Sequence, residues 1–457
     1  MAHLIVLIVS IFMCLSCFFM KREKKMLLIL ISCLLFEDFK ISDYAFSSLR
    51  NLLCIIFFIS ELKYFPHYIK SLKKVHILYL FIIVIIGALI VAVTSHNINS
   101  LSSLLGFLTL ELIAKYFVII YSFVSISKHT SLIRIYNVVS CCLICMTLIG
   151  VINYFFKYSL WGNYFLSDEL DIIAYTGERF RVQSTFIYSF DYGQACVMIC
   201  LFTLYMNSKK ILKRNLFWFS IACCMFGIIS CGCRTVLASF IIALSLYTIL
   251  NYTFSKATAI FLWAFGLVII SYLFVPIAHE KVDFLLSTLD SDSTVGGSSN
   301  TMRIGQYAAV FKFVKDNIVF GLGHNFFLLD IGWQDGMYSM ASKYQVLFGL
   351  EGVLMLLLLE RGVIGVLIYI IFYFGLIRAF KRYFKYAKTE VSTAVSIIIS
   401  FIAYGNMTGE LNSAMLTFIF SGIFLKIAYI KYCNRKKFIF SKDTFLNYGC
   451  LSDHSQL

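Results

Sequence analysis

Long apolar stretches alternate with short charged runs along the whole 457-residue chain. A membrane span needs about 20 apolar residues, or roughly 17–25 when the helix is tilted. The segments that satisfy this are 3–20, 26–42, 47–65, 76–95, 103–126, 134–156, 186–206, 215–231, 235–252, 258–277, 352–377, 390–408 and 412–430. The pattern predicts an all-α polytopic integral membrane protein with about 11–13 transmembrane helices, because acidic and basic residues interrupt segment 26–42.

The composition supports this fold class. Hydrophobic residues make up 60% of the chain, charged residues only 14%, and the mean hydropathy is +0.85, which is outside the range of soluble globular proteins. In a soluble protein a net charge of +15 would indicate a nucleic-acid partner. Here the Lys and Arg residues lie mostly in short loops beside apolar segments, so we interpret the charge as a topology signal and expect no nucleic acid.

The basic runs also predict an orientation. Even numbers of candidate spans separate the runs at 21–25, 70–74, 128–134, 209–214, 378–388 and 431–442. All six can therefore lie on the cytoplasmic side, together with a C-terminal tail at about 431–457. Two long loops, about 157–185 and 278–351, then face the opposite side. Residues 1–457 show no internal repeat, and we expect a single membrane domain.

The fifteen cysteines lie mostly inside apolar runs, where we expect small packing residues rather than metal ligands. Cys231 and Cys233 differ, because they flank a glycine at the end of a predicted span. They would be redox-active only in an oxidising compartment.

Four arginines occur on the predicted outer side, where topology does not require them. An arginine at membrane depth costs about 2.5–3.5 kcal/mol on insertion scales, so one near the interface needs a partner. Two interpretations stay open: local ion pairs with acids, or binding of phosphate, which the planar guanidinium group contacts through two hydrogen bonds. The arginines are Arg179, Arg181, Arg234 and Arg303, and the available acids are Glu178, Asp191 and Asp316.

An amphipathic helix is expected inside the 278–351 loop. Residues 298–301 offer N-cap side chains, and Gly321 and Gly323 would end the helix. We expect this helix to lie on the outer leaflet or to pack beneath the loop. The predicted apolar face is Met302, Tyr307, Ala308, Phe311, Val314 and Ile318.

Four segments together resemble the O-antigen polymerase family, within the superfamily of O-antigen polymerases and ligases. Residues 301–323 are similar to its amphipathic helix, which an Arg opens and a Gly-x-Gly ends, although Ile318 stands where Pro is common. Residues 233–235 resemble its Ser-Arg-Thr corner. Arg181 with 184–186 and 193–195 resembles a pattern that precedes a span, without the usual Pro-Asn. Residues 359–365 are similar to its Glu-x-Gly span start.

The resemblance implies a membrane glycosyltransferase that joins oligosaccharide repeat units carried on undecaprenyl pyrophosphate, at the periplasmic face of the bacterial inner membrane. It implies no metal and no other cofactor. Such a site needs a base for the acceptor hydroxyl and positive charge for the departing pyrophosphate. Glu351 is the candidate base, in an apolar setting. Arg303, Arg181 and Arg234 are the candidate pyrophosphate ligands. A purely structural Arg303–Glu351 ion pair is the alternative.

Glu410 and Arg179 are second-tier site candidates. In the ligase branch a His occupies the position of Glu351, so the chain looks more like a polymerase than a ligase that transfers glycan to lipid A-core. His279 and His324 lie in the same loop but off this motif, and a solvated loop histidine is the interpretation open for either. The rival from another class is a lipid-linked oligosaccharide flippase or other transporter, with mid-span polar groups. Expected partners are the lipid-linked glycan, the bilayer, a chain-length regulator and a flippase.

Overall fold

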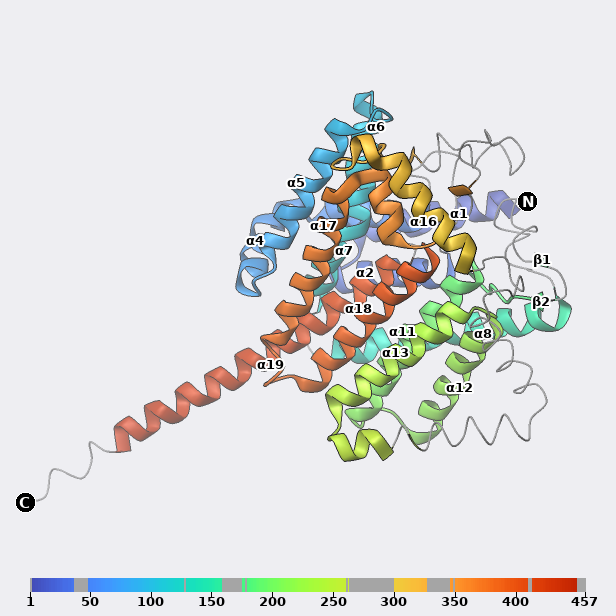
Figure 1. Ribbon diagram of the computed structural model, residues 1–457. Coiled ribbons are helices and arrows are strands. Elements are labelled where there is room, and N and C mark those ends of the chain that lie inside the picture. The colour runs from blue at the N-terminus through green and yellow to red at the C-terminus, as the bar shows by residue number, and fades with distance from the viewer. Residues whose placement is uncertain are drawn as a thin grey trace, which may run out of the picture.

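The computed structural model describes residues 2–36, 48–126, 129–157, 175–176, 179–259, 262, 300–326, 346–347, 350–409 and 413–449. Helices dominate these segments (Figure 1). The first half contains α1 (Ala2–Phe19), α2 (Arg22–Leu35), α3 (Leu49–Glu61), η1 (Leu62–Tyr64), α4 (Phe65–Lys74), α5 (Leu78–Thr94), α6 (Leu101–Leu108), η2 (Thr109–Tyr116), α7 (Val118–Ser125) and α8 (His129–Phe156).

The second half begins with a short antiparallel ladder, in which Thr176 pairs with Arg179. Long helices follow it. The elements are β1 (Tyr175–Thr176), β2 (Arg179–Phe180), α11 (Ser189–Ser208), α12 (Arg214–Ser230), α13 (Arg234–Asn251), α16 (Asn300–Val314), η5 (Lys315–Asn317), α17 (Val353–Lys381), α18 (Lys388–Thr408) and α19 (Ala414–Gly449).

The all-α polytopic prediction is confirmed. In the described part of the chain, seven helices are long and apolar enough to cross a membrane, and three shorter apolar helices accompany them. Each coincides with a span expected from the sequence. Segment 258–277 lies largely outside the described residues, so the total of 11–13 spans stays a prediction. The last helix continues through the basic run at 431–442.

The centre of the bundle is α11, which is buried on nearly all sides. Small residues allow its neighbours to approach closely, as is common between membrane helices. A Cβ on Gly193 would lie 2.7 Å from the Cys231 sulfur. The Gln194 side chain donates to Ser400 Oγ of α18 at 3.0 Å and accepts from Ser239 Oγ of α13 at 2.7 Å. Gln194 therefore ties three helices together inside the apolar core.

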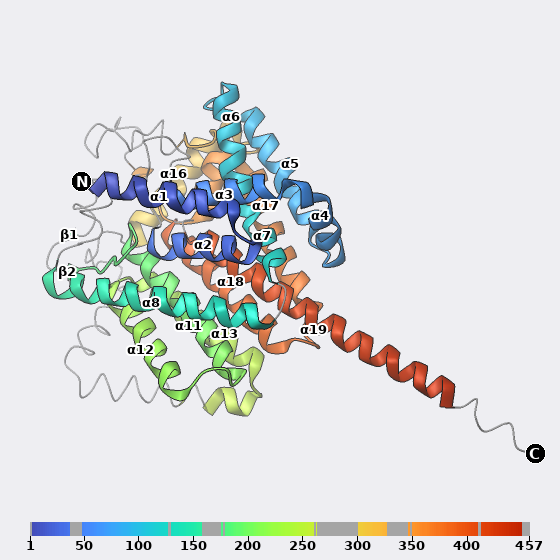
Figure 2. The ribbon, with the colours of Figure 1, turned by 180° about the vertical axis from the view of Figure 1, so that it is seen from behind.

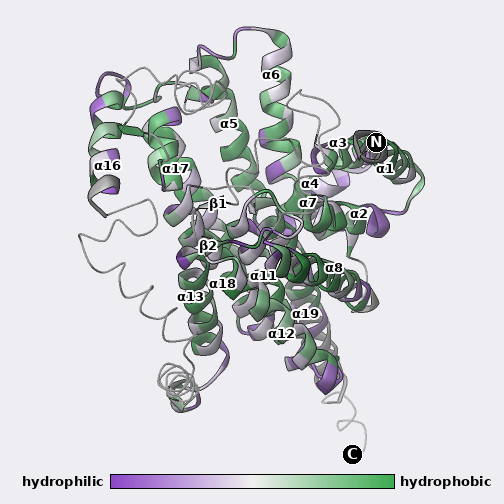
Figure 3. Ribbon diagram, turned by 90° about the vertical axis from the view of Figure 1, so that its right-hand side faces the viewer, coloured by the Kyte–Doolittle hydropathy of each residue, from purple (hydrophilic) through white to green (hydrophobic). Residues whose placement is uncertain are grey.

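The periphery of the bundle is apolar where lipid would surround it. Helices α1, α2, α3 and α8 form the face seen in Figure 2, and they contact one another in pairs. Large side chains such as Phe12, Phe155 and Phe374 are exposed there and on α17. Hydrophilic positions gather at helix ends and along α16 (Figure 3). This distribution is typical of a membrane protein, because lipid rather than protein covers the outer apolar surface.

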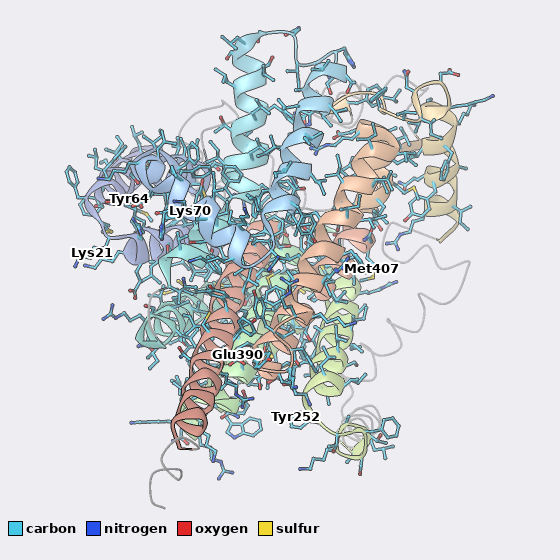
Figure 4. All side chains as sticks on the ribbon, turned by 90° about the vertical axis from the view of Figure 1, so that its left-hand side faces the viewer. Lys21, Tyr64, Lys70, Tyr252, Glu390 and Met407 are labelled. Atoms are coloured by element: carbon cyan, nitrogen blue, oxygen red, sulfur yellow. The ribbon has the colours of Figure 1, made fainter. Side chains whose placement is uncertain are left out.

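Basic runs that are distant in sequence meet at one end of the bundle. Lys209 and Lys431 bind the buried Glu390 carboxylate at 3.0 and 2.6 Å. Figure 4 shows Glu390 and Met407 toward opposite ends of α18. Lys388, at the start of the same helix, donates to the carbonyl oxygen of Asn251. This end, opposite Met407, is called the basic end below.

A second ion-pair group joins α2 to α3. Arg22 and Lys25 bind Glu61 at 2.5 and 3.2 Å, and Tyr68 donates to the same carboxylate at 2.6 Å. Figure 4 shows Lys21, Tyr64 and Lys70 near one another on this flank. These contacts hold the basic run at 21–25 against the end of α3 and the start of α4.

The expected helix of the 278–351 loop is present as α16. Gln306, Val310 and Val314 are buried against α17, at an i, i+4 spacing. Val314 also belongs to the predicted apolar face, whereas Phe311 and Ile318 of that face are 54% and 46% exposed. Helix α16 therefore packs on α17 with one stripe and turns other apolar residues outward, so contact of that outer face with the leaflet stays a prediction.

Helix α17 is broken at Gly362, whose φ is +63°. Residues 318–323 pair with the break: Leu322 and Gly323 donate to the carbonyls of Leu359 and Glu360 at 2.8 and 3.0 Å. In return, the amides after the break donate to the carbonyls of 318 and 319. The loop thus satisfies backbone groups that the break would leave unpaired, as membrane-embedded backbone requires.

Candidate functional site

The two residues with the leading sequence-predicted roles lie together. Arg303, in the first turn of α16, forms an ion pair through Nη2 with Oε2 of Glu351, which lies just before α17. Their side chains are 30% and 28% exposed. Glu351 is therefore paired and partly exposed, rather than in the apolar setting that we expected. The structural pairing left open by the sequence is present.

Close backbone packing positions Glu351. Gly352 has a φ of +107°, and a Cβ there would lie 3.2 Å from the Tyr307 hydroxyl of α16. Gly409, at the end of α18 with a φ of +80°, would place a Cβ 3.6 Å from Cα of Glu351. Asn406 Oδ1 accepts from the Leu354 amide at 3.3 Å, which caps the start of α17. Three elements thus fix the backbone around Glu351.

Helix α18 connects this pair to the start of α11. Near the same end of α18, the Tyr404 hydroxyl donates to Oδ1 of the buried Asp191 at 2.8 Å. Ser189, two residues earlier, lies 3.4 Å from the Cys233 sulfur (Oγ to Sγ). The corner that carries Cys233 and Arg234 is therefore at the same end of the bundle as Glu351.

Arg181 lies against that corner. The amide of Val182 donates to the carbonyl of Ser230 at 3.1 Å, and a Cβ on Gly232 would lie 3.3 Å from Arg181 Cγ. The hydrogen bond with Cys231 and the Arg181 charge lower the pKa of Cys233 to about 7. The structure thus brings Arg181 to the corner and Arg303 to Glu351, and α18 links the two groups.

The structure describes the two second-tier candidates only in part. Glu410 lies outside the described residues. Arg179 is in β2, but its side chain is outside them. Among the residues whose placement is described, no group of three His, Cys, Asp or Glu side chains could hold a metal ion.

A buried charged cluster was not predicted as a site. Arg361, at the break in α17, binds Glu111 of η2 through two hydrogen bonds, at 2.7 and 3.3 Å. Lys115, one turn along, lies 3.5 Å from the same carboxylate. Glu111 and Lys115 are in a π-helical segment, a geometry that is often found at functional sites. Glu111, Lys115 and Arg361 are called the buried cluster below.

A cavity of about 30 Å³ adjoins the buried cluster. It lies between α5, η2 and α17, and the hydroxyl of Tyr369, one of its lining residues, is buried without a hydrogen-bond partner among the described residues. A space of this size admits one or two water molecules. The signal that could have revealed the cluster is the Glu111-x-x-x-Lys115 pair inside an apolar span, because intramembrane charges usually mark function.

His324 connects the loop to the buried cluster. Its amide donates to Ser95 Oγ at 2.9 Å, and its ring lies 4.5 Å from the Phe107 ring (centroid to centroid). Burial and the Arg361 guanidinium lower the pKa of His324 to about 4, so the imidazole is neutral at pH 7. The expectation of a solvated histidine was wrong, because the ring is enclosed between the α5–α6 turn and the loop.

Comparison with known proteins gives no family for the chain: no protein-family model matches it, and no curated protein is significantly similar to it.

Proposed function

We propose that the chain is a membrane glycosyltransferase that polymerises lipid-linked oligosaccharide repeat units. The observation that supports this best is that segments distant in sequence, carrying Arg181, Arg234, Arg303 and Glu351, meet at the end of the bundle opposite the basic end. Glu351 provides a base for a hydroxyl, and Arg303 beside it, with Arg181 and Arg234 at the same end, provides charge for a pyrophosphate.

In the proposed reaction, a hydroxyl oxygen of the acceptor glycan attacks the anomeric carbon of the donor. The bond from that carbon to the pyrophosphate oxygen breaks, and undecaprenyl pyrophosphate leaves with the electron pair. Glu351 accepts the hydroxyl proton. The arginines stabilise the charge that develops on the leaving pyrophosphate. The reaction needs no metal or other cofactor.

The observed ion pair suggests how substrate would activate the base. Arg303 and Glu351 are about 30% exposed, and an ion pair of this kind contributes only about 0–1 kcal/mol. A doubly charged pyrophosphate therefore competes effectively with Glu351 for Arg303. Binding of the donor would release the carboxylate beside the reacting hydroxyl.

The proposal includes a location and partners. The site faces the periplasm of a bacterial inner membrane, and the basic end with the C-terminus faces the cytoplasm, in keeping with the positive-inside rule. A flippase would supply the lipid-linked substrate, and a chain-length regulator would limit the polymer.

A transporter, in particular a lipid-linked oligosaccharide flippase, is the second candidate. The break at Gly362 and the buried cluster favour it, because discontinuous helices and mid-span charges are typical of transporters. The ligase alternative has no such structural support.

Deletion of the gene tests the three functions. Loss of a polymerase leaves surface glycan with a single repeat unit, still attached to its final acceptor. Loss of attachment with long lipid-linked chains intact would indicate a ligase. Accumulation of lipid-linked repeat units on the cytoplasmic side would indicate a flippase and would refute the polymerase.

Variants of the pair test the site. Glu351→Gln and Arg303→Gln should each abolish chain elongation at normal membrane abundance, measured from the glycan ladder on gels. Lys312→Gln, which removes a charge from the exposed part of α16, is the matched control and should retain elongation. The double variant Arg303→Gln/Glu351→Gln separates the alternatives. Recovery of elongation would mean that the pair is only structural, and our site assignment would fail.

A further inference from the structure

A cleft of about 800 Å³ opens at the basic end, far along α17 from the candidate site. It lies between the turn that joins α4 to α5 and the last turns of α17. Five basic residues line it, and all are exposed: Lys73, His76, Arg378, Lys381 and Arg382. The residues that line the cleft include no carboxylate.

The cleft differs from the other basic groups at this end in its lack of acidic partners. Glu61 forms ion pairs with Arg22 and Lys25, and Glu390 forms ion pairs with Lys209 and Lys431. Within the described chain, no carboxylate forms an ion pair with any of the five cleft residues. Positive charges held together in a hollow raise the local concentration of anions. An external anion is the partner that this arrangement favours.

One wall of the cleft is apolar and continues into the surface that lipid covers. Ile82 and Tyr79 of α5 line it and are 48% and 43% exposed. On α17, Phe374 lies one turn before Arg378 and is 67% exposed. Aromatic residues with nearby Lys and Arg are typical of the membrane–water boundary. The cleft thus lies where acyl chains end and head groups begin.

The buried and exposed residues of α4 support a position of the cleft at the membrane–water boundary. It buries Tyr68 and Leu72 and exposes Lys70 and Lys73, an amphipathic pattern that suits a helix lying along the membrane surface. Lys73, in the last turn of α4, and His76, in the turn that follows, line the cleft. His76 has a φ of +56°, a backbone conformation that is uncommon outside glycine and is held where structure requires it.

We propose that this cleft binds the phosphate of an anionic glycerophospholipid from the surrounding leaflet, with the acyl chains along Ile82 and Phe374. Basic pockets between membrane helices bind anionic head groups in this way. A soluble phosphate shares the head-group chemistry, but it would leave the exposed apolar wall without a partner. The proposal is independent of the glycosyltransferase function.

The test is a lipid titration of the purified full-length protein in detergent, followed by native mass spectrometry, which identifies each bound ligand by its mass. The probes are dioleoyl phosphatidylglycerol, dioleoyl phosphatidylcholine and inorganic phosphate. The variant Arg378→Gln/Lys381→Gln/Arg382→Gln removes three cleft charges. The control Lys21→Gln/Lys24→Gln/Lys63→Gln removes three exposed charges outside the cleft.

We expect the wild type to bind phosphatidylglycerol more tightly than phosphatidylcholine. Each Lys or Arg near the surface contributes about fivefold in affinity for an anionic lipid, so the triple cleft variant should lose on the order of 100-fold, and the control much less. If the triple variant does not fold, Arg382→Gln alone should lose about fivefold. Equal loss in the control, no preference for the anionic lipid, or bound inorganic phosphate that displaces the lipid would overturn the proposal.

Discussion

One guanidinium–carboxylate pair lies at each end of the first segment of α17, and the two pairs differ in exposure. The Arg303 and Glu351 side chains at its start are 30% and 28% exposed, whereas those of Arg361 and Glu111 at its break are 13% and 10% exposed. The first pair joins a loop helix to a span. The second joins two spans inside the bundle and has Lys115 as a further neighbour.

This difference in exposure separates a pair that can open from a pair that holds the fold. Water screens an exposed pair, so a ligand exchanges with one partner at little cost. Removing one partner of a buried pair leaves an uncompensated charge in a low-dielectric setting. We therefore expect variants of the outer pair to affect activity, and variants of the buried cluster to affect folding first.

The largest effect is expected at the buried cluster. Glu111→Gln leaves Arg361 charged and without its carboxylate, which costs about 3–5 kcal/mol. The variant should show strongly reduced folded protein in the membrane and a lower melting temperature in detergent, followed by fluorescence-detected size exclusion. Glu351→Gln at the outer pair is the matched control, with a loss below about 1 kcal/mol. A Glu111→Gln protein as stable as the control would remove the distinction between the two pairs.

The break in α17 is the next most sensitive position. A Cβ on Gly362 would lie 2.3 Å from the carbonyl oxygen of Val319, at a φ that side chains rarely adopt. Gly362→Ala should therefore cost about 2–4 kcal/mol, seen as a lower melting temperature. Gly305→Ala on α16 is the control, because a Cβ there meets nothing within 4 Å. It should be neutral or stabilising by up to about 1 kcal/mol. Equal tolerance of both changes would mean that the docked loop does not hold the break.

The sequence predicted the helices and the outer pair for different reasons. Apolar runs of span length predict helices, because lipid offers no hydrogen-bond partners and the backbone N–H and C=O groups must pair within the segment. Arg303 was selected because arginine on the outer side has no role in topology, and Glu351 because of its position in the family resemblance. Whether they pair or bind substrate depends on how α16 lies on α17, which the sequence does not specify.

The buried cluster and the orientation of α16 could not be derived from local pattern. Arg361 and Glu111 are 250 positions apart, and only the packing of η2 against α17 brings them together. The sequence shows Glu111 and Lys115 as a pair inside an apolar span, but it does not identify Arg361 as the third member of the cluster. Likewise, Gly362 is visible as a glycine, whereas its φ of +63° follows from the docked loop.

The smallest expected effect is a change in the reactivity of Cys233, which tests whether water reaches the corner beside Arg181. Because the hydrogen bond with Cys231 and the Arg181 charge lower the pKa of Cys233 to about 7, its thiolate should form between pH 6 and 8, well below the usual value of 9.0. Alkylation of Cys233 by iodoacetamide, measured by peptide mass spectrometry, should rise through that range. Arg181→Gln should move the midpoint to higher pH, whereas Lys213→Gln at the α11–α12 turn should not. The buried Cys224 should stay unlabelled in the folded protein. If Cys233 were equally unreactive at pH 8, the corner would be closed to water, and Arg181 could not contact a substrate from the aqueous side.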